Sequence, residues 1–223
     1  MELRDYPDRE MLAMGLADAL ASALKTALTT HDHATLCVPG GSTPGETFVT
    51  LSGVDLEWER VRVLLGDERW VPESDPRSNT RLLRETLLTD RAARAAHVPM
   101  ISDAPTPEAG IEALAPAVEA ALPISVLLLG MGADMHTASL IPDADRLEEA
   151  MAEDAPVLMP IRAPSVTEPR ITLTRRVLAD AMETHVLITG DEKRSVLERA
   201  QRRDPMEAPI AAFLRDATVH WAP

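Results

Sequence analysis

The chain has 223 residues, of which 45% are hydrophobic and only 3% aromatic, so we expect one domain over residues 1–223 with a core of aliphatic side chains. A formal net charge of -14 argues against nucleic acid and anionic membranes as partners, because phosphate contacts need clustered cations. The lone Cys37 excludes an internal disulfide. The N-terminus lacks an apolar signal core, and no stretch resembles the ~20 apolar residues of a membrane span, which predicts a cytoplasmic protein.

Strand and helix patterns alternate along the chain. Leucines at helical spacing predict an amphipathic helix over residues 8–28, and further helices are expected at 46–52, 78–88, 106–122 and 191–203. Short apolar runs predict strands at 35–38, 60–65, 124–130, 169–174 and 184–190, with a final edge strand at 218–222. The Pro-rich residues 156–169 indicate an irregular surface excursion. The alternation predicts an α/β, Rossmann-like fold: a doubly wound, largely parallel sheet with helices on both faces.

The first candidate site is the loop after the strand at 35–38. Gly40 and Gly41 let the backbone approach a ligand, Thr43 suits a helix N-cap, and Pro44 suits the first helical turn. The hydroxyls of Ser42 and Thr43 and the free N–H groups of the helix start would then hold an anion. The alternative is an ordinary tight turn before a capped helix.

The second candidate site follows the strand at 60–65, where Asp67, Glu68 and Arg69 come in succession. Arg69 can grip a phosphate or a carboxylate with two parallel hydrogen bonds. A solvated turn of ion pairs is the alternative reading.

The third candidate site is the glycine-containing loop at 130–140, which follows an apolar strand. His136 can act there as a general base, and Asp134 can influence its orientation and charge. A structural or solvated histidine is the alternative. Arg170 and Lys193 lie beside other strands and could reach a phosphate, or could be plain surface residues. No group of residues has metal-ligand spacing, so neither a metal nor another cofactor is expected.

Five segments in this order resemble the motifs of the 6-phosphogluconolactonase family, within the glucosamine-6-phosphate isomerase/6-phosphogluconolactonase superfamily. They are VPGGSTPGETF, LLGDERWVPESDPRSN, LLLGMGADMHTASLIP, PRITLT and ITGDEKRSVLERA, and together they span about residues 34–202. The resemblance implies that Ser42, Thr43 and Arg69 hold the sugar phosphate and that His136 is the base. It extends less directly to Asp67, Asp134, Arg170 and Lys193.

The activity implied by this resemblance is hydrolysis of 6-phosphoglucono-1,5-lactone to 6-phosphogluconate, in the oxidative pentose phosphate pathway, by water that His136 activates. The expected partner is the small sugar-phosphate lactone, and the expected assembly is a monomer or weak homodimer. A glucosamine-6-phosphate deaminase or isomerase is one alternative, although its Ala-Phe-Asn-Glu-Pro run is replaced here by TASLIP. A sugar-phosphate-binding protein with weakened catalysis is the other.

Met135 departs from the family pattern, which has glycine just before the histidine. A side chain here either turns aside on a backbone of ordinary negative φ, or crowds the sugar at strained positive φ. We expect the first arrangement, because an unbranched methionine is flexible.

Overall fold

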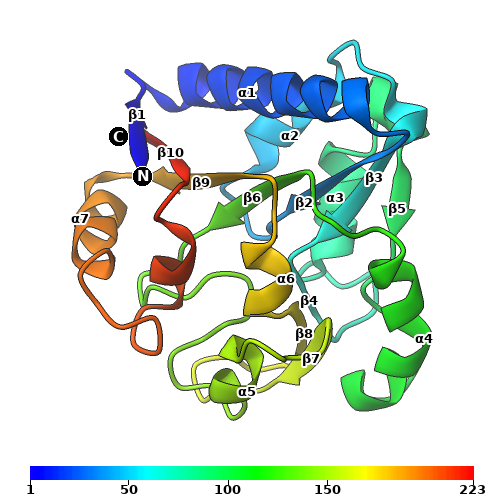
Figure 1. Ribbon diagram of the computed structural model, residues 1–223, viewed down its shortest axis with the longest axis vertical. Helices are drawn as coiled ribbons and strands as arrows, with labels where there is room; N and C mark the ends of the chain where they lie inside the picture. Colours follow the sequence, from blue (N-terminus) through cyan, green and yellow to red (C-terminus); the bar gives the residue numbers. More distant parts are fainter.

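The computed structural model describes residues 1–223, and its centre is a seven-stranded sheet in which all neighbouring strands are parallel (Figure 1). The strand order is β1-β10-β9-β6-β2-β3-β5. The strands are β1 (Glu2–Asp5), β2 (Ala34–Val38), β3 (Val61–Leu65), β5 (Ala96–Val98), β6 (Val126–Gly130), β9 (Glu183–Thr189) and β10 (Thr218–Ala222). The α/β fold with a largely parallel sheet is therefore confirmed.

Helices cover both faces of this sheet. They are α1 (Arg9–Thr30), α2 (Gly45–Ser52), α3 (Asn79–Thr86), α4 (Pro107–Glu119), α5 (Leu147–Met151), α6 (Arg175–Ala179) and α7 (Asp191–Ala200). In Figure 1, α1 and α2 lie above the sheet, whereas α6 and α7 lie below it. Side chains cap the starts of α1 and α3: Asp8 accepts from the Met11 N–H, and Ser78 accepts from the Arg81 N–H.

A second, smaller sheet stands apart from the first and is antiparallel, in the order β4-β8-β7. Its strands are β4 (Asp67–Arg69), β8 (Arg170–Leu173) and β7 (Leu158–Ile161). The acidic turn after β3 is thus a short strand, and the strand expected at 169–174 belongs to this sheet. The Pro-rich excursion expected at 156–169 is also wrong in part, because β7 lies within it and is fully buried.

The edge of the central sheet also differs from expectation. β10 is not the edge strand, because β1 pairs with it on the outer side. The sequence of β1, Glu2 to Asp5, is mostly charged, and three of its four residues are exposed. An exposed edge strand has no buried face and so needs no alternation of apolar residues, which is why residues 2–5 carry no pattern that predicts a strand.

Helix α1 is long and apolar enough to cross a membrane by length and composition alone, contrary to the expectation that no stretch resembles such a span. Half of its most apolar window is buried inside the protein. Leu12, Leu16 and Leu20 on this helix pack into the hydrophobic core. Core helices of globular proteins pass the same test of length and composition, and α1 has their packing.

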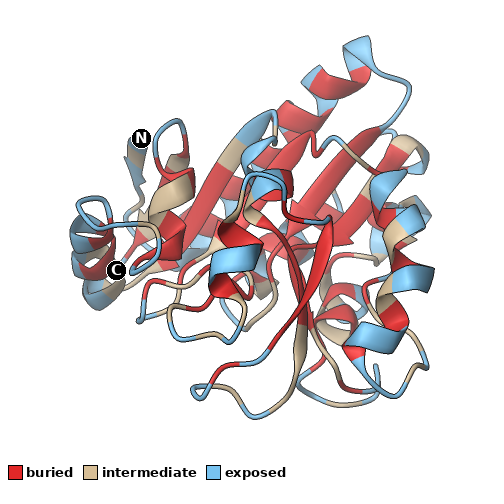
Figure 2. Ribbon diagram, turned by 60° about the horizontal axis from the view of Figure 1, so that its bottom comes forward, coloured by how far each residue is buried: buried red, intermediate tan, exposed pale blue.

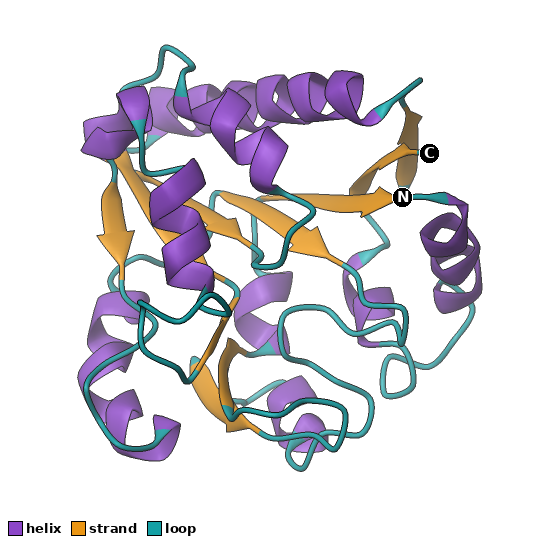
Figure 3. Cartoon of the chain, turned by 180° about the vertical axis from the view of Figure 1, so that it is seen from behind, coloured by secondary structure: helices purple, strands orange, loops and turns teal.

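The strand order places a topological switch point between β2 and β6. From β2 the chain proceeds to β3 and β5 on one side, and from β6 it proceeds to β9 and β10 on the other. The inner strands of the central sheet are buried along most of their length (Figure 2), and loops gather where they end (Figure 3). Ligands of open parallel sheets bind at the carboxyl ends beside such a switch point. The loops at 39–44 and 131–140 leave from these two strands.

Candidate active site

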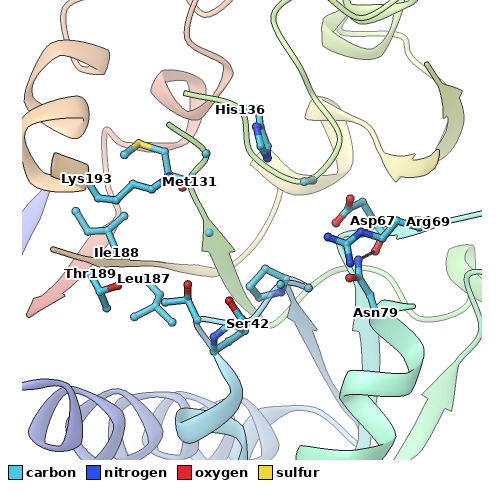
Figure 4. A pocket seen from close by; sticks show the side chains of 18 of the residues that line it. Ser42, Asp67, Arg69, Asn79, Met131, His136, Leu187, Ile188, Thr189 and Lys193 are labelled. Atoms are coloured by element: carbon cyan, nitrogen blue, oxygen red, sulfur yellow. Dashed lines mark hydrogen bonds between the residues drawn. The ribbon is translucent and has the colours of Figure 1, made fainter. Parts of the chain in front are cut away.

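A cavity of about 300 Å³ opens at the carboxyl ends of β2 and β6. Most of the residues expected from the sequence line it: Gly40, Gly41, Ser42, Thr43, Asp67, Arg69, His136, Arg170 and Lys193. Figure 4 shows His136 pointing into the space between Lys193, Ser42 and the pair Asp67 and Arg69. Asp134 does not line the cavity but contacts His136. The fold therefore gathers side chains that lie far apart in the sequence.

His136 is oriented by Asp134. The ring Nδ1 lies 2.5 Å from Asp134 Oδ1, and no hydrogen bond joins Nε2 to the protein. Because a carboxylate accepts, this contact places the proton of a neutral ring on Nδ1 and leaves Nε2 as the acceptor. Burial opposes ionisation of Asp134, but its hydrogen bond and charge attraction to His136 outweigh that effect, so the pKa of Asp134 lies below its ordinary value.

The loop that carries His136 is closed by its own backbone. The Gly132 N–H donates to the His136 carbonyl at 2.9 Å, and the Met135 N–H donates to the Gly132 carbonyl at 3.1 Å. A Cβ at Gly132 would lie 2.2 Å from His136 Nδ1 and 2.3 Å from Asp134 Oδ1. Only glycine at position 132 leaves room for the carboxylate–imidazole contact.

Met135 combines a positive φ with a side chain that lies outside the cavity. Its φ is +68°, so the expectation of ordinary negative φ is wrong. Its side chain nevertheless turns away from the cavity and is buried in the hydrophobic core. The tight turn from Gly132 to His136 decides the backbone conformation, and the flexible thioether adapts by packing behind the loop. The position therefore carries backbone strain without obstructing the cavity.

The glycine loop reaches the cavity from the end of β2. Gly41 has φ +84°, and helix α2 begins at Gly45, preceded by Pro44. The expected N-cap at Thr43 is wrong, because no side chain caps this helix. The first N–H groups of a helix have no partner within the helix, and here no cap replaces one. The start of α2, together with the Ser42 and Thr43 hydroxyls, can therefore donate to an anion.

The two strands β4 and β8 bring Asp67, Arg69 and Arg170 together. Arg69 and Arg170 are directly paired across the strands, and Asp67 lies two residues before Arg69 on the same face. Asp67 Oδ2 accepts from Ser139 Oγ at 2.5 Å and lies 3.6 Å from Arg170 Nη1. Arg69 Nη1 donates to the Arg77 carbonyl at 2.5 Å. This wall of the cavity thus holds two guanidinium groups and one carboxylate.

Lys193 forms the opposite wall, on the first turn of α7. Its Nζ donates to the Met131 carbonyl at 2.7 Å. Burial lowers the pKa of Lys193, and the negative charges of Asp134 and Glu192 partly oppose that effect. A half-buried ammonium held by one carbonyl retains donors for a ligand.

Glu68, between the two cavity residues Asp67 and Arg69, faces away from the cavity. It is fully buried and accepts hydrogen bonds from Ser78, Asn79, Thr80 and the Arg69 N–H. Burial raises the pKa of Glu68, while these hydrogen bonds oppose the rise. Its carboxylate accepts from N–H groups at the start of α3. Successive side chains of a strand point to opposite faces, so Asp67 and Arg69 face the cavity and Glu68 does not.

Three polar residues of the site were not expected from the sequence: Asn79, Ser139 and Thr189, the last of which lines the cavity at the end of β9. Asn79 lines the cavity, donates from Nδ2 to the Asp67 carbonyl at 2.9 Å, and has no partner for Oδ1. Ser139 holds the Asp67 carboxylate from the histidine loop. The only sequence signal for Asn79 was its place just after the cap Ser78, and Ser139 lay within the TASLIP run without a distinct role. No group of three or more histidine, cysteine or acidic side chains is placed to hold a metal ion.

The family model for glucosamine-6-phosphate isomerases/6-phosphogluconolactonase matches residues 7–221 of this chain. The chain belongs to this family. It is 41% identical to a 6-phosphogluconolactonase of Mesorhizobium japonicum, with 98% of this chain and 94% of that protein covered. It is 41% identical to one of Pseudomonas aeruginosa, with 95% and 90% covered. The crystal structure of a 6-phosphogluconolactonase from Shewanella baltica superposes with a TM-score of 0.95 at 32% identity, covering 100% of this chain and 98% of that one.

Proposed function

We propose that this protein hydrolyses 6-phosphoglucono-1,5-lactone to 6-phosphogluconate, as a single domain acting in the cytoplasm as a monomer or weak homodimer. The observation that carries the proposal is the His136 ring, which is fixed through Nδ1 by Asp134 and faces a cavity with cations on two walls. Full-length similarity to proteins named 6-phosphogluconolactonase supports the same activity. A sugar-phosphate lactone, anionic at one end and an activated ester at the other, matches such a cavity.

In the proposed reaction, His136 Nε2 takes a proton from a water molecule as the water oxygen attacks the lactone carbonyl carbon. The tetrahedral intermediate then collapses, the bond from that carbon to the ring oxygen breaks, and the imidazolium returns the proton to the ring oxygen. The new carboxylic acid loses its proton to solvent. Asp134 keeps Nδ1 protonated and stabilises the imidazolium between the two steps. Since the lactone is an activated ester, this series of steps needs neither a covalent intermediate nor a metal.

The phosphate of the substrate would be held by donors alone. Ser42 and Thr43 offer hydroxyls beside the start of α2, and Lys193 offers an ammonium across the cavity. Arg69 and Arg170 supply further positive charge from the small sheet. Binding the phosphate at a fixed point orients the carbonyl toward the water at His136, which is the main contribution that a site for an activated ester has to make.

The deaminase and isomerase alternative is not favoured by the site. Proton transfer between neighbouring sugar carbons calls for a free carboxylate in the cavity, and Asp67 is the sole acidic residue in its lining. Its Oδ2 is engaged by Ser139. The binding-protein alternative rested on Met135, whose side chain lies outside the cavity.

An assay of both reactions tests the proposal. We expect the purified protein to hydrolyse 6-phosphoglucono-1,5-lactone well above the spontaneous rate and to release no ammonia from glucosamine 6-phosphate. Ammonia release without lactone turnover would overturn the proposal, and absence of both would support a binding role.

A further inference from the structure

Arg170 has a guanidinium group whose hydrogen-bonding capacity is almost unused. Its side chain is only 13% exposed, lines the cavity and makes no hydrogen bond, and its Nε is buried without a partner. The nearest anionic atoms are Asp67 Oδ2 at 3.6 Å and Glu168 Oε1 at 3.7 Å. Charge-assisted hydrogen bonds are ~2.7 to 2.9 Å long, so both carboxylates neutralise the cation without capturing its donors.

Both carboxylates are prevented from moving closer. Asp67 Oδ2 is held by Ser139 Oγ at 2.5 Å. Glu168 Oε2 accepts from Thr167 Oγ1 at 2.6 Å and from Arg77 Nη1 at 3.0 Å, which turns Oε1 toward Arg170. The two fixed carboxylates therefore orient the Arg170 guanidinium and leave its N–H groups free for a ligand. A buried donor without a partner gains more from a new acceptor than a donor that is already paired.

Glu168 also compensates an unfavourable pair. Arg69 and Arg170 are direct cross-strand neighbours in β4 and β8, and like charges at such positions repel each other. Burial opposes ionisation of Glu168, but the Thr167 hydrogen bond and the charges of Arg170, Arg77 and Arg69 outweigh it, so the pKa of Glu168 lies below its ordinary value. Glu168 is thus an anion next to a cluster of cations and outside the cavity lining.

We propose that Glu168 is a positioning residue that holds the Arg170 guanidinium open at the cavity wall for the anionic substrate. This inference rests on the proposed function for the identity of the substrate. It predicts that Glu168 affects binding through Arg170, without touching the substrate.

The test compares Glu168→Gln with the wild type, because glutamine keeps the shape and removes the charge. We expect the KM for the lactone and the Kd for 6-phosphogluconate, measured by calorimetry, to rise about three- to tenfold, with kcat within about twofold. Glu168→Asp, which keeps the charge, should lie nearer the wild type. Glu149→Gln, which removes an equivalent carboxylate from the exposed ion pair with Arg146, is the matched control and should change neither value.

A double-mutant cycle shows whether Glu168 acts through Arg170. Arg170→Met should raise Kd, and adding Glu168→Gln to Arg170→Met should raise it no further. Independent, multiplicative effects would overturn the inference, as would a Glu168→Gln Kd within about twofold of the wild type. Should Glu168→Gln fail to fold, Thr167→Val makes the same comparison, because it removes one of the two hydrogen bonds that hold Glu168 Oε2. The expected rise in Kd is then smaller, and an unchanged Kd would overturn the positioning role of Glu168.

Failure of the proposed function would look different. A wild type that binds 6-phosphogluconate but does not hydrolyse the lactone would defeat the lactonase proposal, while the ratio of Kd values between variants would still decide the role of Glu168. A wild type that does not bind 6-phosphogluconate would overturn the positioning role as well.

Discussion

The side-chain amide of Asn79 occupies the space that a side chain at Gly40 would fill. A Cβ built on Gly40 would lie 1.9 Å from Asn79 Oδ1 and 2.0 Å from its Cγ. Asn79 is itself fixed by its hydrogen bonds to the Asp67 carbonyl and to Glu68. The glycine loop can therefore pack against Asn79, and so beside the small sheet, only while position 40 has no side chain.

We expect Gly40→Ala to displace the loop or Asn79, and so to lower kcat/KM at least about tenfold and to reduce the melting temperature. Gly66→Ala is the matched control, because a Cβ there meets its nearest neighbour at an ordinary 3.7 Å. Lactone assays and thermal melts of both variants check the prediction. Equal kinetics for the two alanine variants would mean that the loop yields easily.

The contact between His136 and Asp134 predicts a graded kinetic effect. His136→Ala should lower kcat by about 10² to 10⁴, as expected for a lost general base, with little change in KM. Asp134→Asn should lower kcat less, because it leaves the imidazole in place but removes the charge that fixes its Nδ1 proton. Steady-state kinetics on the lactone provide the measurement. Near wild-type kcat in His136→Ala would move the search for a base to Asp67, the carboxylate in the cavity.

Replacing Met135 by glycine should have opposite effects on backbone strain and on core packing. Met135→Gly relieves a positive φ worth about 1 kcal/mol, but it removes a buried side chain, whose loss costs roughly 2 to 5 kcal/mol. We therefore expect a lower melting temperature, with kcat/KM within about threefold of wild type since the side chain lies outside the cavity. Met135→Ala, which keeps the strain and also loses the side chain, should be less stable still. Higher turnover and a higher melting temperature in Met135→Gly would show that the methionine does impair the site.

A buried histidine pair predicts acid sensitivity. Tyr6 Oη lies 2.9 Å from His220 Nδ1, and His220 Nε2 lies 3.1 Å from His185 Nδ1. Burial, then the charges of His185 and Arg4, lower the pKa of His220 to about 3, and burial lowers the pKa of His185, although Glu183 opposes this.

The folded protein therefore keeps His220 neutral well below the pH at which the unfolded chain protonates it, about pH 6.5, and the lowered pKa of His185 acts in the same direction. Unfolding therefore binds protons, so the contribution of this pair to stability is fully present above that pH and is lost as the pH falls toward the pKa of about 3 of His220. Urea unfolding at a series of pH values should show this loss. His220→Gln should flatten the dependence, whereas His33→Gln, at an exposed position, should not. A pH dependence unaltered by His220→Gln would contradict the assignment.

Chelators should leave lactone hydrolysis intact. The proposed reaction requires a water molecule, a base and bound phosphate, and no group of three or more potential ligands is placed to hold a metal. Activity measured after incubation with EDTA and dialysis should match the untreated protein. Loss of activity that zinc or magnesium restores would contradict the prediction.

Local patterns in the sequence determined the five longer helices, most strands of the central sheet and the loops at their ends, whereas the five-residue helices α5 and α6 were not predicted. Apolar runs such as residues 124–130 and the cap at Ser78 are signals carried by neighbouring residues, and they were sufficient for the α/β fold. Parallel strands share one carboxyl edge, so the strands expected at 35–38, 60–65 and 124–130 imply that the segments following them lie at the same edge.

Only the tertiary structure decided how these segments meet. The assignment of β8 to a separate antiparallel sheet depends on pairing with β4, about a hundred residues earlier, and it alone makes Arg69 and Arg170 neighbours. The contacts of Asn79 with Gly40 and of Ser139 with Asp67 likewise join distant segments. At Met135 the closed turn of the loop imposes a positive φ, although a residue with a side chain favours negative φ. Local propensity is a property of neighbouring residues, whereas strand pairing and side-chain register are settled by what the whole core can bury.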